Sequence, residues 1–326
     1  MQSSQPAPSL RENEIADIVS YVRIAELHGT HLSLTEALRL TSTEMSEEEL
    51  ARAWAELGNL SLEYTLRSGR FVSRRVLQEA GHAAIEARLD EGRRRVAANM
   101  QTARSVWRVF SKDGLKMFAV SGGNSYEFAR QNDDIDVFCV TKTGSLWPFV
   151  LKHLLVSRFY AIFRKDIPRL CFSYILDEES ARREFSEPKD RLFARDALSL
   201  KVVEGHDFFV SLLKGAGWMK ELFPKSYAAS VGATAEHTPE TGPSTGARIL
   251  NLFLFRTVGL YIRAKSILDN ARNRKRGASK FVNRLSADEG YVLFESRKYQ
   301  GLRGMYATNR SGRRPEAPQT ELPRPT

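Results

Sequence analysis

Short apolar stretches alternate with a helix-length apolar segment over residues 115–176, and this alternation restricts the fold more than any other feature. The stretches KMFAV, IDVFCVT and LCFSYIL have the length and the β-branched and aromatic content of buried strands. A helical run, residues 146–163, separates the second stretch from the third. Strands that alternate with helices predict an α+β fold, a mixed sheet flanked by helices.

The segment before this region predicts a small winged-helix-like module of three short helices and a hairpin. Its signals are helical spacing in residues 15–27, capping boxes at Ser33 with Glu36 and Ser46 with Glu49, and strand alternation around Ser68 and Gly69. The helix expected over residues 47–57 carries four glutamates and one arginine, which disfavours contact with DNA phosphates. We therefore expect this module to pack or to dock a partner rather than to read DNA.

Composition shifts divide the chain into six expected parts. They are a winged-helix-like module (1–75), a basic connecting helix (76–112), a central core (113–228), a flexible linker (229–247), a C-terminal helical region (248–308) and a disordered tail (309–326). The helix expected near residues 249–268 is apolar on nearly every face, so we expect it to be buried against the core.

No stretch has the length and apolar content of a signal peptide or a membrane span, so we expect a soluble cytoplasmic protein without membrane contact. Cys139 and Cys171 lie in apolar runs, as reduced buried thiols do. The formal charge of +10 suits an anionic partner. The basic run 272–284 suits the phosphates of nucleic acid or of a nucleotide, and it equally suits a solvated loop.

Two aspartates stand at alternate positions at the start of the IDVFCVT stretch. In a strand, Asp134 and Asp136 would project to one face while Ile135 and Val137 enter the core. Two carboxylates so placed suit a hard cation, Mg²⁺ or Mn²⁺, which takes one or two protein carboxylates and completes its shell with substrate phosphates. The pair is thus a candidate for both metal binding and catalysis.

A Ser-Gly-Gly turn precedes these aspartates. Ser121, Gly122 and Gly123 end one strand, and the absence of Cβ atoms at the two glycines would let a triphosphate approach the backbone. Neither the turn nor the aspartate pair is specific alone. Together they make complementary demands on one ligand, a metal-bound nucleoside triphosphate (NTP), and their order and spacing are the informative feature.

The arrangement resembles the DNA polymerase β-like nucleotidyltransferase superfamily. In that superfamily a Gly-Gly or Gly-Ser turn is followed, after about ten residues, by two acids separated by one hydrophobic residue. The resemblance covers most of residues 12–305. Within the superfamily, the chain is similar to a bacterial group in which an N-terminal helical and hairpin module precedes the catalytic domain. The matching elements are DDID (133–136), Trp147, LCFSYIL (170–176) and WMKELFP (218–224).

The resemblance implies a nucleotidyltransferase core with ATP or another NTP on Ser121, Gly122 and Gly123, and the catalytic metal on Asp134 and Asp136. It implies transfer of a nucleoside monophosphate to an acceptor hydroxyl, with release of pyrophosphate. The acceptor is left open between RNA, a small molecule and a protein hydroxyl.

The chain departs from the family pattern at two places. The loop after the glycines is bulky, with Tyr126, Glu127 and Phe128, and LCFSYIL lacks the third carboxylate that usually helps to activate the acceptor. The acids that flank this stretch are Asp166, Asp177 and Glu178. Two alternatives to an active enzyme therefore stay open: a catalytically degenerate nucleotide- or nucleic-acid-binding protein, and a winged-helix regulator with a nucleotide-sensing domain.

Overall fold

A six-stranded mixed sheet forms the centre of this α+β protein, a computed structural model of which describes residues 12–27, 31–41, 45–57, 63–110, 114–126, 129, 134–163, 170–232, 244–275 and 283–308. The strand order is β6-β3-β4-β5-β8-β7. The strands are β3 (Leu115–Val120), β4 (Ile135–Thr141), β5 (Leu170–Asp177), β6 (Lys201–Glu204), β7 (Asn283–Ala287) and β8 (Tyr291–Ser296). The α+β class and the three central strands expected from the alternation are confirmed.

Strands β4 and β5 are the parallel pair of the sheet, and the other pairings are antiparallel. A parallel pair needs a crossover connection, and α6 (Leu146–Phe163) supplies it. Alternate residues of the central strands enter two apolar clusters, so both sheet faces are covered. Val120, Ile135 and Val137 belong to the cluster that includes α6, whereas Phe138 and Val140 belong to the cluster on the opposite face.

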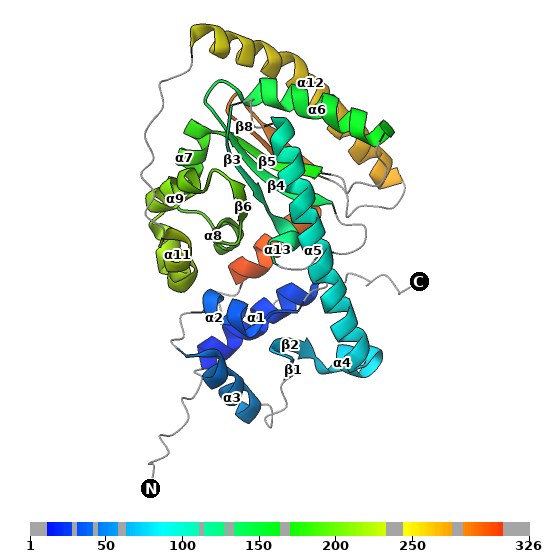
Figure 1. Cartoon of the computed structure of the whole chain (residues 1–326), viewed down its shortest axis with the longest axis vertical. Coiled ribbons are helices and arrows are strands. Elements are labelled where there is room, and N and C mark those ends of the chain that lie inside the picture. Colours follow the sequence, from blue (N-terminus) through cyan, green and yellow to red (C-terminus); the bar gives the residue numbers. More distant parts are fainter. Residues whose placement is uncertain are drawn as a thin grey trace.

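Helices cover the two faces of the sheet unequally. On one side lie α5 (His82–Phe110), α6 and α12 (Thr245–Lys275), of which α6 and α12 run side by side (Figure 1). The opposite side carries α7 (Glu178–Ser186), α8 (Arg191–Leu198), α9 (His206–Gly215), α10 (Trp218–Leu222), α11 (Pro224–Val231) and α13 (Arg297–Thr308). The region 248–308, expected to be helical, thus also contributes two strands, β7 and β8.

The N-terminal elements are α1 (Glu12–Leu27), α2 (Leu34–Leu40), α3 (Glu47–Leu57), β1 (Tyr64–Arg67) and β2 (Arg70–Ser73). Both expected capping boxes are present, because Ser33 and Ser46 each exchange hydrogen bonds with the glutamate three residues later. The expected hairpin is confirmed as well. One continuous apolar cluster includes Trp54 and Phe71 of these elements together with Met117 and Phe138 of the sheet, so the module is packed onto the core.

Two helical expectations need correction. The connecting helix expected over residues 76–112 is broken at Gly81, whose φ of +77° ends α4 (Arg74–Ala80) before α5 begins. Helix α12 is buried on one face only, and its opposite face is exposed, because α12 forms the outermost layer against α6 (Figure 1). Periodicity cannot tell an apolar surface that faces the core from one that faces outward.

Within the described helices, none combines the length and the apolar content needed to cross a bilayer. Cys139 is a buried free thiol, as expected, whereas the free thiol Cys171 is only partly buried. The tail expected at 309–326 and residues 233–243 of the expected linker lie outside the described residues. The two ends of that linker are helical, because residues 229–231 belong to α11 and residues 245–247 to α12.

Candidate nucleotide and metal site

The Ser-Gly-Gly turn and the aspartate pair meet at one end of the central sheet. Strands β3 and β4 are antiparallel, with Val120 opposite Val137, so the residues just beyond β3 lie beside the start of β4. The Ser121 amide donates a hydrogen bond of 2.9 Å to the backbone oxygen of Asp136. The structure therefore brings together two sequence features that are separated by about a dozen residues of chain.

Gly122 is the point of closest approach between the two features. Its φ is +63°, a left-handed backbone conformation that residues other than glycine rarely adopt. A Cβ atom built on Gly122 would lie 2.3 Å from Oδ2, 3.1 Å from Cγ and 3.2 Å from Cβ of Asp136. Glycine is thus required at this position twice, by its backbone angle and by the carboxylate beside it.

The turn itself is a single turn of 3₁₀ helix, η2 (Gly122–Asn124), rather than the start of an α-helix. The Ser125 amide and hydroxyl both donate to the Gly122 carbonyl, at 3.0 and 2.7 Å. The buried Asn124 side chain accepts a 2.8 Å hydrogen bond from Asn99 of α5. These bonds hold the turn in place beside the carboxylate and against the long helix.

Asp134 and Asp136 are placed as the strand pattern predicted. Ile135 and Val137 are fully buried, while Asp136 is partly buried and Asp134 is exposed immediately before β4. Strand alternation directs the two carboxylates to the face opposite Ile135 and Val137. They can therefore approach one ligand at the end of the sheet without entering the core.

Cys171 is the neighbour of Asp136 on the next strand. The two residues are partners in the parallel register of β4 and β5. Burial, followed by the charges of Asp136 and Asp134, raises the pKa of the Cys171 thiol to about 12, so the thiol stays neutral beside the carboxylates. Sequence reasoning treated Cys171 only as a core residue, because a parallel register cannot be read from the pattern of one strand.

The flanking acids Asp177 and Glu178 do not complete a metal site. Asp177 is the register partner of Thr141, at the end of β5 remote from Cys171, and its carboxylate caps α7 through the Ser180 amide. Glu178 forms an ion pair of 2.5 Å with Lys116. Asp166 lies outside the described residues. Among the residues that the structure describes, no three His, Cys, Asp or Glu side chains form a metal-binding group.

Tyr126, part of the bulky loop, links the turn to α8. Its hydroxyl donates to Oδ1 of Asp196, and the Arg195 guanidinium lies over the Tyr126 ring at 4.3 Å from the centroid. The Asp196 side chain is partly buried on its helix, where it accepts this hydrogen bond from Tyr126. The neighbours Glu127 and Phe128 lie outside the described residues.

Burial raises the pKa of Asp196 from its ordinary value of 3.8 to about 6, against the lowering effects of Tyr126 and Arg195. The folded protein therefore holds this proton more tightly than the unfolded chain. The contribution of Asp196 to stability is greatest below pH 3.8 and is lost as the pH rises to about 6. We expect Asp196→Asn to remove this dependence, which melting temperatures of both proteins between pH 4 and 7 would reveal. Melting temperatures that change with pH by the same amount in both proteins would contradict the assignment.

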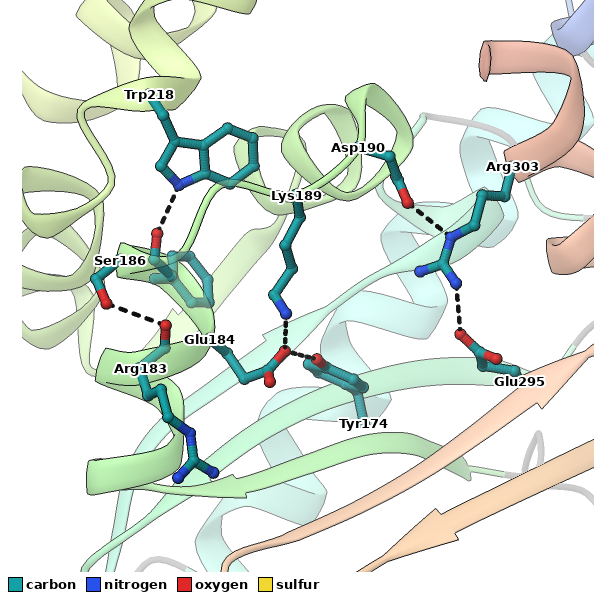
Figure 2. A network of polar contacts seen from close by, with 10 residues as sticks. Tyr174, Arg183, Glu184, Ser186, Lys189, Asp190, Trp218, Glu295 and Arg303 are labelled. Carbon is teal, nitrogen blue, oxygen red and sulfur yellow. Dashed lines mark hydrogen bonds and ion pairs between the residues drawn. The ribbon is translucent and has the colours of Figure 1, made fainter. Parts of the chain in front are cut away.

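A second polar network fixes the elements around β5 (Figure 2). Glu184 of α7 accepts a hydrogen bond of 2.9 Å from the Tyr174 hydroxyl and pairs with Lys189 at 2.9 Å. Arg303 of α13 bridges Asp190 at 2.7 Å and Glu295 of β8 at 3.1 Å. Each carboxylate in this network has a cationic partner, so the network serves to join α7, α8, β8 and α13.

The basic segments give no sign of a second site in the described residues. Arg93, Arg94 and Arg95 pair with Asp90 and Glu91 of the preceding turn of α5, as in a solvated charged helix. The run 272–284 is described only at its two ends. Binding of nucleic acid through these segments stays a prediction.

Comparison with protein-family models, with characterised proteins and with solved structures gave no match.

Proposed function

We propose that this chain is a metal-dependent nucleotidyltransferase of the DNA polymerase β-like kind, with its site at the shared end of β3 and β4. One observation carries the proposal: the positive-φ Gly122 lies directly against the Asp136 carboxylate, and the preceding Ser121 amide donates a hydrogen bond to the Asp136 carbonyl. Because the turn lacks a side chain, a phosphate group can approach its backbone closely. The adjacent carboxylate could then bind a metal ion that is coordinated by the same phosphate.

The donor set suits a hard cation. Carboxylate oxygens are the preferred ligands of Mg²⁺, which commonly uses only one or two of them together with substrate phosphates. Asp136 would supply a ligand that is fixed by the sheet, and the exposed Asp134 a second one that adapts to the substrate. When bound, the cation would neutralise phosphate charge during in-line transfer.

The protein's own groups would then position the triphosphate. Ser121, Gly122 and Gly123 form a backbone turn held by Ser125 and Asn124, so the phosphates would meet a preorganised surface. The acceptor would be a hydroxyl group, and pyrophosphate would leave. The chemical class of the acceptor stays open between RNA, a small molecule and a protein side chain.

Cys171 supports a second candidate, a protein that binds NTP and metal without turnover. A neutral thiol stands in register beside Asp136, on the strand where the superfamily usually keeps its third carboxylate. A thiol with so high a pKa neither binds a hard cation well nor accepts a proton from the attacking hydroxyl at neutral pH. Binding with slow or no transfer is the expectation from this feature.

Asp134→Asn tests both candidates, because Asp134 is exposed and its loss should leave the fold intact. We expect Mg²⁺-dependent NTP binding to weaken by at least about 100-fold, and any release of pyrophosphate to fall in parallel. Equilibrium titration with each NTP, with and without EDTA, measures the first; a pyrophosphate assay measures the second. Asp207→Asn, at another exposed aspartate, is the matched control.

Wild-type binding without pyrophosphate release would select the non-catalytic candidate. Equal NTP binding by the wild type, Asp134→Asn and Asp207→Asn would exclude both candidates, as would binding that is indifferent to EDTA.

A further inference from the structure

Helix α12 presents an apolar stripe to solvent. All but two of the large apolar side chains that are exposed in the described part of the chain belong to it: Ile249, Leu250, Phe253, Leu260, Tyr261, Ile267 and Leu268. Phe253, Leu260 and Ile267 are 61, 68 and 69% exposed. The opposite side of the helix is covered, with Val258 and Ile262 buried among the residues of α6. A contiguous stripe of this kind marks an interaction surface.

The stripe follows a seven-residue repeat. Phe253, Leu260 and Ile267 are seven residues apart, and a second row of small exposed residues, Thr257, Ala264 and Ala271, has the same spacing. The two rows alternate at intervals of three and four residues, as the a and d positions of a coiled-coil seam do. A seam with that repeat indicates that the partner is another helix.

We propose that α12 pairs with α12 of a second copy of this chain, antiparallel and about a two-fold axis. In an antiparallel pair, each a position faces a d position. One alignment then places Phe253 opposite the partner's Ala271, Leu260 opposite the partner's Ala264 and Ile267 opposite the partner's Thr257. Each of these three large side chains faces a small one, which is the alternation that lets packed layers interdigitate. Leu250, which begins the second row, lies opposite the partner's Arg274 at the edge of the paired region.

The surface is therefore complementary to itself, as an isologous two-fold interface requires. A parallel pairing would instead set Phe253, Leu260 and Ile267 against their own copies and leave gaps between the small residues. An interfacial lipid contact requires neither the seven-residue spacing nor a row of small residues along the middle of the stripe.

The charges beside the stripe allow this pairing. Arg263 donates 2.8 Å to the Ala287 carbonyl of its own chain and lies over its own Phe255 ring. Lys265 forms an ion pair with Asp269 on the same helix. Arg263, Lys265 and Asp269 are thus engaged within each copy, whereas the exposed Arg256 lies beside the seam. The basic residues Arg272, Arg274 and Lys275 lie near the end of the helix.

The paired length from Phe253 to Ala271 is about 28 Å at the helical rise. An interface of one helix pair lies at the small end of the range for specific complexes, so we expect a dimer with a micromolar dissociation constant. Sedimentation velocity of the full chain from about 1 to 100 μM should show the monomer–dimer transition that such an affinity produces.

Leu260→Lys is expected to raise the dissociation constant by at least about 100-fold, because it places a charge at the centre of the seam. Leu155→Lys makes the same change at a 63% exposed leucine of α6 that lies outside the repeat, and it should keep the dimer. Melting temperatures confirm that both variants fold. Dimerisation of Leu260→Lys equal to that of the wild type would overturn the proposal.

A size exchange tests the facing of large and small residues. Ala264→Leu alone sets two leucines against each other, and Leu260→Ala alone sets two alanines against each other, so each should weaken the dimer. The double variant restores one large and one small side chain in each layer, and we expect it to recover most of the wild-type affinity. Additive weakening in the double variant would contradict the facing.

Vesicle binding distinguishes the dimer from the remaining alternative, in which a membrane surface covers the stripe. A wild type that stays monomeric to about 100 μM, yet sediments with phosphatidylserine-containing vesicles and not with neutral ones, would overturn the dimer in favour of a membrane surface. Monomers that bind neither vesicles nor each other would overturn it as well.

Discussion

Gly122→Ala is expected to weaken Mg²⁺-dependent NTP binding by about 100-fold while the protein stays folded. The new methyl group would fall 2.3 Å from Oδ2 of Asp136, far inside contact distance, so the carboxylate must rotate away from the turn. A displacement of about 1 Å at a metal ligand is enough to weaken binding or transfer by about 100-fold. Titration of the folded variant with NTP and Mg²⁺ measures this loss directly.

Gly69→Ala is the matched control for the backbone part of the effect. Gly69 has φ of +73° in the β1–β2 hairpin, close to the +63° of Gly122, but a Cβ there meets nothing within 4 Å. Both variants should lose about 1–2 kcal/mol of unfolding free energy from the left-handed backbone. Only Gly122→Ala should lose NTP binding. A binding loss shared by both variants would trace the effect to general destabilisation rather than to Asp136.

Local patterns were sufficient to predict the parts of the site that one segment determines. The alternation in IDVFCVT predicts a strand with Asp134 and Asp136 on one face, and the structure has β4 with Ile135 and Val137 fully buried. The capping box at Ser33 and the hairpin turn at Ser68 are likewise short-range signals. Each depends on neighbours within a few residues, which the sequence displays directly.

Contacts between distant segments could not be predicted in the same way. The register that sets Cys171 beside Asp136 depends on how β4 and β5 align, and the hydrogen bond from Tyr126 to Asp196 depends on the packing of α8. The exposed face of α12 was predicted to be buried, since an apolar helix face indicates packing without naming the partner. In the proposed dimer this face is buried, but by α12 of the second copy rather than by the core of its own chain.

Gly205→Ala is expected to be the most destabilising of the glycine substitutions considered. Gly205 has φ of +81° at the start of α9, and a Cβ there would lie 2.0 Å from the Lys116 carbonyl oxygen and 2.8 Å from the Met117 Cα atom. These atoms belong to the backbone of β3, a central strand that cannot rotate aside as a side chain can. Left-handed strain and overpacking together predict a loss of about 3–5 kcal/mol.

Urea unfolding of Gly205→Ala and Gly69→Ala separates these two contributions. Gly69 has φ of +73° in the β1–β2 hairpin, close to that of Gly205, and a Cβ there meets nothing within 4 Å. The control should therefore lose only the backbone part, about 1–2 kcal/mol. The difference between the two variants reports the collision with β3. Equal losses of unfolding free energy in the two variants would show that α9 can move away from Lys116 without cost. That result would contradict the close packing of α9 on the sheet.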